Sequence, residues 1–131
     1  MNDKNIRVII VLGVLIIHLL VATKIRFIAY QNNWGIIIQI VLGSIPSFYS
    51  VIGLTSLANI FEKTKRLKMP FIVGFACLLY EITGDFGRTS GSGTNFDVYD
   101  IVAILIGILI SYLLEKYYFI KIESKTKHNT I

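Results

Sequence analysis

The residues from 81 to 110 read EITGDFGRTSGSGTNFDVYDIVAILIGILI. The first part of this stretch holds acidic residues and an arginine, and a long apolar run follows directly. An ionised side chain at the centre of a bilayer costs roughly 2.5–3.5 kcal/mol even on insertion scales. Charges at the edge of so apolar a run therefore indicate either a functional site or a set of helix caps at a membrane boundary.

The composition of the whole chain indicates an integral membrane protein. The 131 residues are 54% hydrophobic and only 16% charged, with a mean hydropathy of +0.68. A soluble domain usually carries about 25% charged residues. The length suits one domain covering residues 1–131.

The net charge of +5 does not predict a nucleic-acid partner. The basic residues form short clusters between apolar runs, whereas a nucleic-acid interface would gather them in one stripe. Clusters of this kind are typical of signals that fix membrane topology.

Four apolar segments follow one another, at residues 6–22, 34–61, 69–83 and 99–119, before a polar tail at 120–131. They predict an all-α bundle of four transmembrane helices. The third segment is short, ~22 Å at the helical rise of 1.5 Å per residue. Glu81 must therefore lie near the membrane surface or inside the bundle.

Ten of the 13 Lys and Arg residues fall near the N-terminus up to Arg7, between the second and third segments, and from Lys116 onward. Only Lys24, Arg26 and Arg88 fall on the opposite side. The positive-inside rule then places both termini in the cytoplasm, and the acidic segment outside a bacterial cytoplasmic membrane.

Small residues inside the segments predict close helix packing. Gly43 and Ser47 form one pair four residues apart, and Gly107 and Ser111 form another. Pro46 removes a helical hydrogen bond that nearby serine hydroxyls can replace.

His18 lies at a depth similar to that of Glu81. Two arrangements stay open for it, a neutral histidine hydrogen-bonded between helices or a pair with Glu81. The lone Cys77 has no partner thiol and is interpreted as a buried apolar residue. No metal site or cofactor is predicted.

The residues from 84 to 98 are rich in Gly, Ser and Thr and predict a flexible loop or a re-entrant turn. Asp97 suits the N-cap of the fourth helix, and Asp100 its first turn. Capping does not account for Glu81 and Arg88. We expect Arg88 to bridge neighbouring acids and hold the loop against the helix ends.

The order and spacing of these residues resemble the VanZ-like family of small bacterial membrane proteins. In that family a third helix ends in Glu-x-x-Gln, an Arg follows, and Phe-Asp-x-x-Asp-x-x-x-Asn-x-x-Gly opens the fourth helix. Gly84 and Ile104 stand where the family has Gln and Asn. The matching positions here are Glu81, Arg88, Phe96, Asp97, Asp100 and Gly107.

The resemblance implies a cell-envelope protein whose outward polar cluster binds a lipid head group, an envelope precursor or a membrane-protein partner, and affects antibiotic susceptibility. Alternatives are a membrane-embedded enzyme that acts on a lipid-linked substrate with Glu81 or Asp100 as base, a small transporter subunit, and a scaffold. Whether the chain forms oligomers stays open. The candidate ligand-binding residues are Glu81, Arg88, Asp97, Asp100 and His18.

Overall fold

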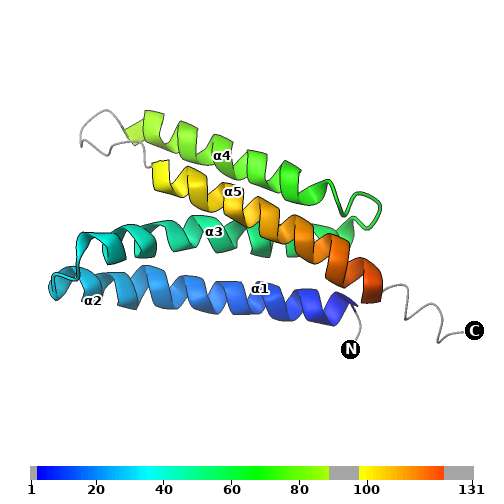
Figure 1. Cartoon of the computed structure of the whole chain (residues 1–131), viewed down its shortest axis with the longest axis horizontal. Coiled ribbons are helices and arrows are strands. Elements are labelled where there is room, and N and C mark those ends of the chain that lie inside the picture. Colours follow the sequence, from blue (N-terminus) through cyan, green and yellow to red (C-terminus); the bar gives the residue numbers. More distant parts are fainter. Residues whose placement is uncertain (1–2, 89–97, 123–131) are drawn as a thin grey trace, which may run out of the picture.

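The computed structural model describes residues 3–88 and 98–122, and within these ranges it contains helices and no strand. The first long helix consists of α1 (Asp3–Leu19), a π-helical segment η1 (Leu20–Ile25) and α2 (Arg26–Gln31). The others are α3 (Ile36–Phe61), α4 (Met69–Arg88) and α5 (Val98–Leu113), which continues into a second π-helical segment, η2 (Leu114–Phe119). Figure 1 shows them as a bundle of roughly aligned rods.

Three helices are long and apolar enough to cross a membrane, namely Asp3–Gln31, Ile36–Phe61 and Val98–Ile122. The apolar part of α4, Met69–Thr83, is shorter. Large apolar side chains cover the outside of the bundle, and Phe61 is 82% exposed. Soluble proteins rarely expose apolar surface on this scale. The all-helical class and a membrane location are therefore confirmed.

Helix α3 is the centre of the bundle, because it packs against α1, α4 and α5. Helix α4 packs on α5 as well. In Figure 1, α1 lies on one side of α3, and α4 and α5 lie on the other. Residues near both ends of α3 can therefore meet side chains from several helices.

Helices α3 and α5 approach each other closely at Gly107. A Cβ added there would lie 2.7 Å from the carbonyl oxygen of Phe48 and 3.1 Å from the Cβ of Val51. Ser111, one turn further along α5, is buried too. The packing role predicted for Gly107 and Ser111 is thus confirmed. A Cβ at Gly43, in contrast, would meet nothing within 4 Å, so the predicted close packing at Gly43 is wrong.

Two helix ends differ from the predicted ones. The first helix continues past residue 22 to Gln31, since residues 23–31 contain neither Gly nor Pro, and it places Lys24 and Arg26 in helix instead of loop. It ends where Asn33 adopts a positive φ of 48°. Helix α4 likewise continues to Arg88, through residues predicted as loop. The remainder of that predicted loop, 89–97, is outside the described residues.

The first residue of α1, the α3–α4 connection and the end of η2 all lie at one end of the bundle (Figure 1). The basic clusters at Lys4 and Arg7, at residues 63–68 and at Lys116 and Lys121 therefore share that end. We call it the basic end, and the opposite end, with the α2–α3 turn and the start of α5, the acidic end.

Candidate functional site

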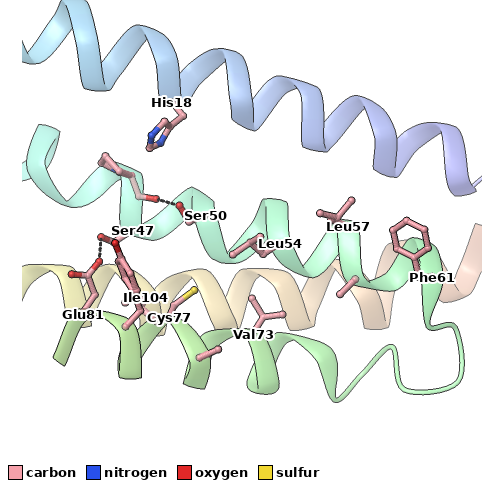
Figure 2. Close-up of a pocket in the computed structure, with 14 residues that line it drawn as sticks. His18, Ser47, Ser50, Leu54, Leu57, Phe61, Val73, Cys77, Glu81 and Ile104 are labelled. Atoms are coloured by element: carbon pink, nitrogen blue, oxygen red, sulfur yellow. Dashed lines mark hydrogen bonds between the residues drawn. The ribbon is translucent and has the colours of Figure 1, made fainter. Parts of the chain in front are cut away.

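Three helices bring polar side chains together at the acidic end. The Ser47 Oγ on α3 lies 3.1 Å from Asp100 Oδ1 on α5 and 3.5 Å from Glu81 Oε1 on α4. Figure 2 shows the Ser47 and Glu81 side chains meeting below α3. A hydroxyl carries one proton, so Ser47 donates to one carboxylate at a time. The two sequence-predicted acids thus share one donor.

Local sequence explains how each group reaches this place. Pro46 interrupts the hydrogen bonding of α3, and the Ser50 hydroxyl donates to the Pro46 carbonyl at 2.6 Å. Ser44 donates to the Ile40 carbonyl at 3.1 Å, so Ser44 and Ser50 bond within α3, whereas the Ser47 hydroxyl faces the acids. Asp100 lies in the first turn of α5, where the positive end of the helix dipole stabilises a carboxylate.

Ser47, Ser50 and Glu81 line one end of a cavity of about 760 Å³, and Asp100 contacts that end through Ser47. Apart from His18, the remainder of its lining is largely apolar and comes from α3 and α4, with Ile104 contributed by α5. In Figure 2, the side chains of Leu54, Leu57 and Phe61 follow Ser47 and Ser50 along α3, away from the polar end. The cavity is therefore polar at one end and apolar along its length.

His18 of α1 lines the same cavity from the other side of α3. Its Nδ1 lies 3.2 Å from the Tyr49 hydroxyl, and the two rings meet edge to face with centroids 5.8 Å apart. Of the two arrangements open for His18, the hydrogen bond between helices is the one present. His18 and Glu81 share the cavity without pairing.

Two predicted site residues cannot be placed. Arg88 is the last residue of α4, but its side chain is outside the described part of the structure, and Asp97 is outside it entirely. The expected bridge from Arg88 and the expected cap by Asp97 remain predictions. Of the predicted set, Glu81 and His18 line one cavity, and Asp100 contacts Ser47, which lines it too.

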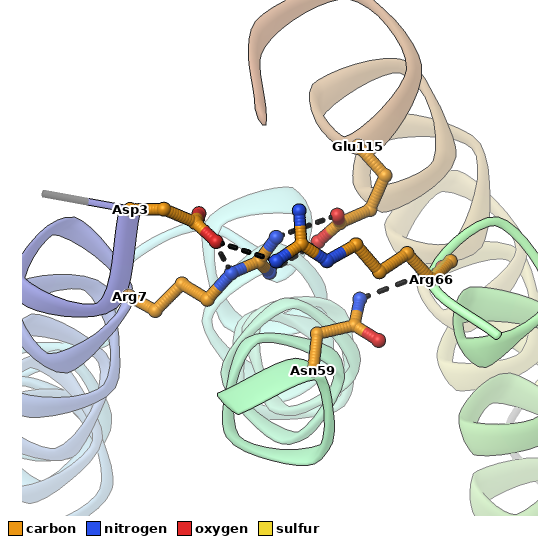
Figure 3. Close-up of polar contacts among 5 residues, drawn as sticks. All are labelled: Asp3, Arg7, Asn59, Arg66 and Glu115. Atoms are coloured by element: carbon orange, nitrogen blue, oxygen red, sulfur yellow. Dashed lines mark hydrogen bonds and ion pairs between the residues drawn. The ribbon is translucent and has the colours of Figure 1, made fainter. Parts of the chain in front are cut away.

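A second polar cluster, at the basic end, was not predicted. The Arg7 guanidinium binds Glu115 through two hydrogen bonds, of 2.5 and 2.7 Å, and it also donates to Asp3 at 3.0 Å. Arg66, in the α3–α4 connection, donates to the other oxygen of Asp3 at 2.8 Å. Figure 3 shows these side chains converging between the helix ends.

This cluster is closed and neutral in sum. The side chains of Arg7 and Glu115 are 0% and 2% exposed. The Arg7 guanidinium also lies 3.9 Å from the ring centre of Phe119, and the Asn59 amide donates to the Arg66 carbonyl at 3.4 Å. Two arginines and two acids balance in charge, which a buried ionic group requires. The arrangement ties four chain segments together.

Among residues 3–88 and 98–122, no group of three His, Cys, Asp or Glu side chains could hold a metal ion. Comparison of the chain with models of known protein families, with curated proteins and with solved structures finds no match.

Proposed function

We propose that the chain is a VanZ-like, multi-pass protein of the bacterial cytoplasmic membrane with four spans and both termini inside. Helix α4 has 20 residues, or ~30 Å, the thickness of the hydrocarbon core. Placing the basic end in the cytoplasm follows the positive-inside rule. Glu81 and Asp100, two members of the VanZ-like pattern, lie at the opposite end and share Ser47.

The function we propose is binding of a polar head group at the outer membrane face, at the site formed by Ser47, Glu81, Asp100 and His18. One observation carries it: carboxylates from two helices converge on one hydroxyl at the polar end of a cavity. Carboxylates accept hydrogen bonds and attract positive charge. The head group is therefore one that donates hydrogen bonds through hydroxyl or amine groups.

The test uses small, tail-free head-group fragments. The full chain in lipid nanodiscs is titrated with ethanolamine and with glycerol while the backbone amide signals of Ser47 and Asp100 are followed by NMR. We expect saturable shifts for both fragments, weakened in Glu81→Gln because a neutral amide accepts less strongly. Acetate is the control and should produce no shift.

Equal shifts with acetate and ethanolamine would contradict the proposal, and so would an unchanged response of Glu81→Gln. The variant's membrane level is measured alongside. A normal level together with a lost response assigns Glu81 to binding rather than to folding.

A further inference from the structure

The cavity reaches from the acidic end to the opposite end of α3. Its floor on α3 ends at Phe61, the last residue of that helix, and its wall on α4 begins at Val73. The polar side chains lie at the other end, so the part between Ser50 and Phe61 has a mainly apolar lining. That part is ~17 Å long at the helical rise. One leaflet is about half of a ~30 Å hydrocarbon core, so this length suits one acyl chain from the leaflet at the basic end.

This part of the cavity is a groove on the outside of the bundle and not a closed chamber. Phe61 is 82% exposed, and Leu54 and Leu57 along the floor are exposed as well. In Figure 2 the floor helix α3 lies between α1 and α4, which flank it. A molecule that diffuses within the membrane plane can therefore enter the groove from the side.

The α3–α4 connection, residues 62–68, lies at the basic end of the groove, because it joins the floor helix to the wall helix (Figure 2). The connection is held in place at Arg66. The Arg66 side chain donates to Asp3 at 2.8 Å, and the Arg66 carbonyl accepts a hydrogen bond from the Asn59 amide at 3.4 Å. The other side chains of the connection are therefore presented from a fixed backbone.

The connection carries an excess of exposed positive charge. Lys63, Lys65 and Lys68 are exposed, whereas Arg66 is buried in the closed cluster. Glu62 is the only acid among residues 62–68, and it interacts electrostatically with Lys65. The ammonium groups of Lys63 and Lys68 thus carry the excess, next to the two helix ends that border the groove. Lysine is a common phosphate ligand, and basic segments beside a membrane attract anionic lipids.

From these features we propose that the groove and the connection form a site for an anionic phospholipid of the leaflet at the basic end, which is the inner leaflet in the proposed orientation. The phosphate lies at Lys63 and Lys68, and one acyl chain follows α3 from Phe61 toward Ser50. A lipid of that leaflet already has its head at the basic end and its tail toward the bilayer centre, so it enters without inversion. This site is separate from the head-group site proposed at the acidic end.

Competition between two lipids tests the head class. The full chain is purified in a neutral detergent and mixed with equal amounts of dipalmitoyl phosphatidylglycerol and dipalmitoyl phosphatidylcholine, which share their tails and differ in head charge. Native mass spectrometry at low ionic strength measures the ratio of the two lipids bound. We expect phosphatidylglycerol to be preferred, because each lysine contributes about fivefold to the affinity for an anionic lipid.

Two double variants remove the same charge from the same end of the bundle. Lys63→Gln with Lys68→Gln changes the connection, and Lys116→Gln with Lys121→Gln changes the end of the helix that begins with α5. The first should lower the ratio about fivefold for each lysine, and the second should leave it within about twofold. Glu62→Gln should raise the ratio, because it removes a negative charge beside the lysines.

A second pair of variants tests the position of the tail. Val73→Phe enlarges a side chain in the groove wall, and Val8→Phe makes the same change at an exposed position of α1 outside the lining. We expect Val73→Phe to weaken binding of dipalmitoyl phosphatidylglycerol. Binding of dihexanoyl phosphatidylglycerol, whose tails are too short to follow the groove, should stay as in the native chain. Val8→Phe should change neither.

The outcomes separate the head, the tail and the occupant. Equal binding of both lipids by the native chain would overturn the site, and so would equal losses in the two double lysine variants. Unchanged binding of the dipalmitoyl lipid in Val73→Phe would overturn the tail assignment, provided that circular dichroism shows native helix content. A lipid-free dimer that Val73→Phe abolishes would replace the lipid with a second copy of the chain. The lysine variants should keep the NMR response to ethanolamine, so failure of this site is distinguishable from failure of the head-group site.

Discussion

The two ends of the bundle place their charged side chains in different surroundings. At the basic end, Arg7 and Glu115 form a closed pair with almost no exposed surface. At the acidic end, Glu81 and Asp100 approach one serine hydroxyl beside an open groove. Opposite charges hold helices together in the first case, whereas in the second two acids from different helices share one hydroxyl that lines a cavity.

This difference predicts that the polar residues at the basic end stabilise the fold, whereas those at the acidic end bind a ligand. Removing one partner of a buried ion pair leaves an uncompensated charge, which is strongly destabilising. Removing one neutral hydrogen-bonding group costs only about 0.5–1.5 kcal/mol. Stability measurements should therefore respond at the basic end, and binding measurements at the acidic end.

The largest effect is expected for Arg7→Leu. Loss of the guanidinium leaves the Glu115 carboxylate buried and unpaired, and should lower the free energy of unfolding by about 3–5 kcal/mol. Unfolding in detergent micelles measures it. The double variant Arg7→Leu with Glu115→Leu should recover most of the loss.

Lys4→Leu is the control, since Lys4 is an exposed cation on the same helix, and its change should stay within about 0.5 kcal/mol. A double variant as unstable as Arg7→Leu would show that the pair is not the source of the effect.

Gly107→Ala tests the contact between α3 and α5 that lies between the two ends of the bundle. Gly107 is on α5, between Asp100 and the basic cluster. The new Cβ would press on the Phe48 carbonyl, and a backbone atom cannot move aside cheaply. We expect a loss of about 1–3 kcal/mol in the same unfolding assay.

Gly43→Ala adds the same methyl group where nothing lies within 4 Å. It should range from neutral to about 1 kcal/mol more stable, as alanine favours a helix over glycine. Similar losses at both glycines would mean that α3 and α5 do not meet at Gly107.

Ser47→Ala tests whether the polar groups of the acidic end contribute to binding rather than to stability. It removes the donor that Glu81 and Asp100 share, so the NMR response to ethanolamine should weaken while the unfolding free energy changes by about 1 kcal/mol or less. Ser44→Ala is matched to it, since the Ser44 hydroxyl bonds only its own helix. If Ser44→Ala weakens the response equally, the effect belongs to α3 as a whole.

The smallest expected effect is a change in the pKa of Glu62, an acid that belongs to neither cluster. Glu62, in the α3–α4 connection, accepts hydrogen bonds from the hydroxyl and the backbone N–H of Thr64, which lower the pKa of its carboxyl. Thr64→Val removes the hydroxyl donor and should raise that pKa toward its ordinary value, as measured by NMR titration.

The lowered pKa of Glu62 sets the sign of its pH dependence. The hydrogen bonds favour the ionised form, so their small contribution is present above the ordinary pKa of Glu and is lost as the pH falls through the lowered one. The native chain should therefore be slightly more stable than Thr64→Val at neutral pH, and the difference should vanish below the lowered pKa. An unchanged pKa in Thr64→Val would assign the shift to the backbone donor alone.

Much of the acidic end could be predicted from the sequence, because acids at the edge of an apolar run indicate either a site or helix caps. Glu81 and Asp100 were both expected in the site, and the structure places both against Ser47. Ser47 itself was interpreted as a small packing residue and as one of the serines that could replace the hydrogen bond lost at Pro46. Sequence spacing within α3 gives no information on which side chains of α4 and α5 it faces.

The basic end was missed for a different reason. Arg7 and Arg66 were counted as topology signals, and counting charges by side ignores which of them pair. A signal did exist: Asp3 and Arg7 are four residues apart on a helix, and Glu115 is an acid at the end of an apolar run. Pairing Arg7 with Glu115 still requires the fold, since the two are far apart in sequence.

The π-helical segment η2 has a consequence for the register of α5. Ala103, Gly107, Ser111, Glu115 and Phe119 are all buried and lie at intervals of four residues. In a regular α-helix each such step overshoots a full turn by ~40°, so the later members of the series would rotate away from α3. A π turn accommodates more residues and cancels part of this rotation. Deleting one residue from 114–118 should therefore be absorbed within this segment, because four α-helical steps turn through ~400°, about as far as the five π-helical steps they replace, so the Phe119 ring would stay over Arg7.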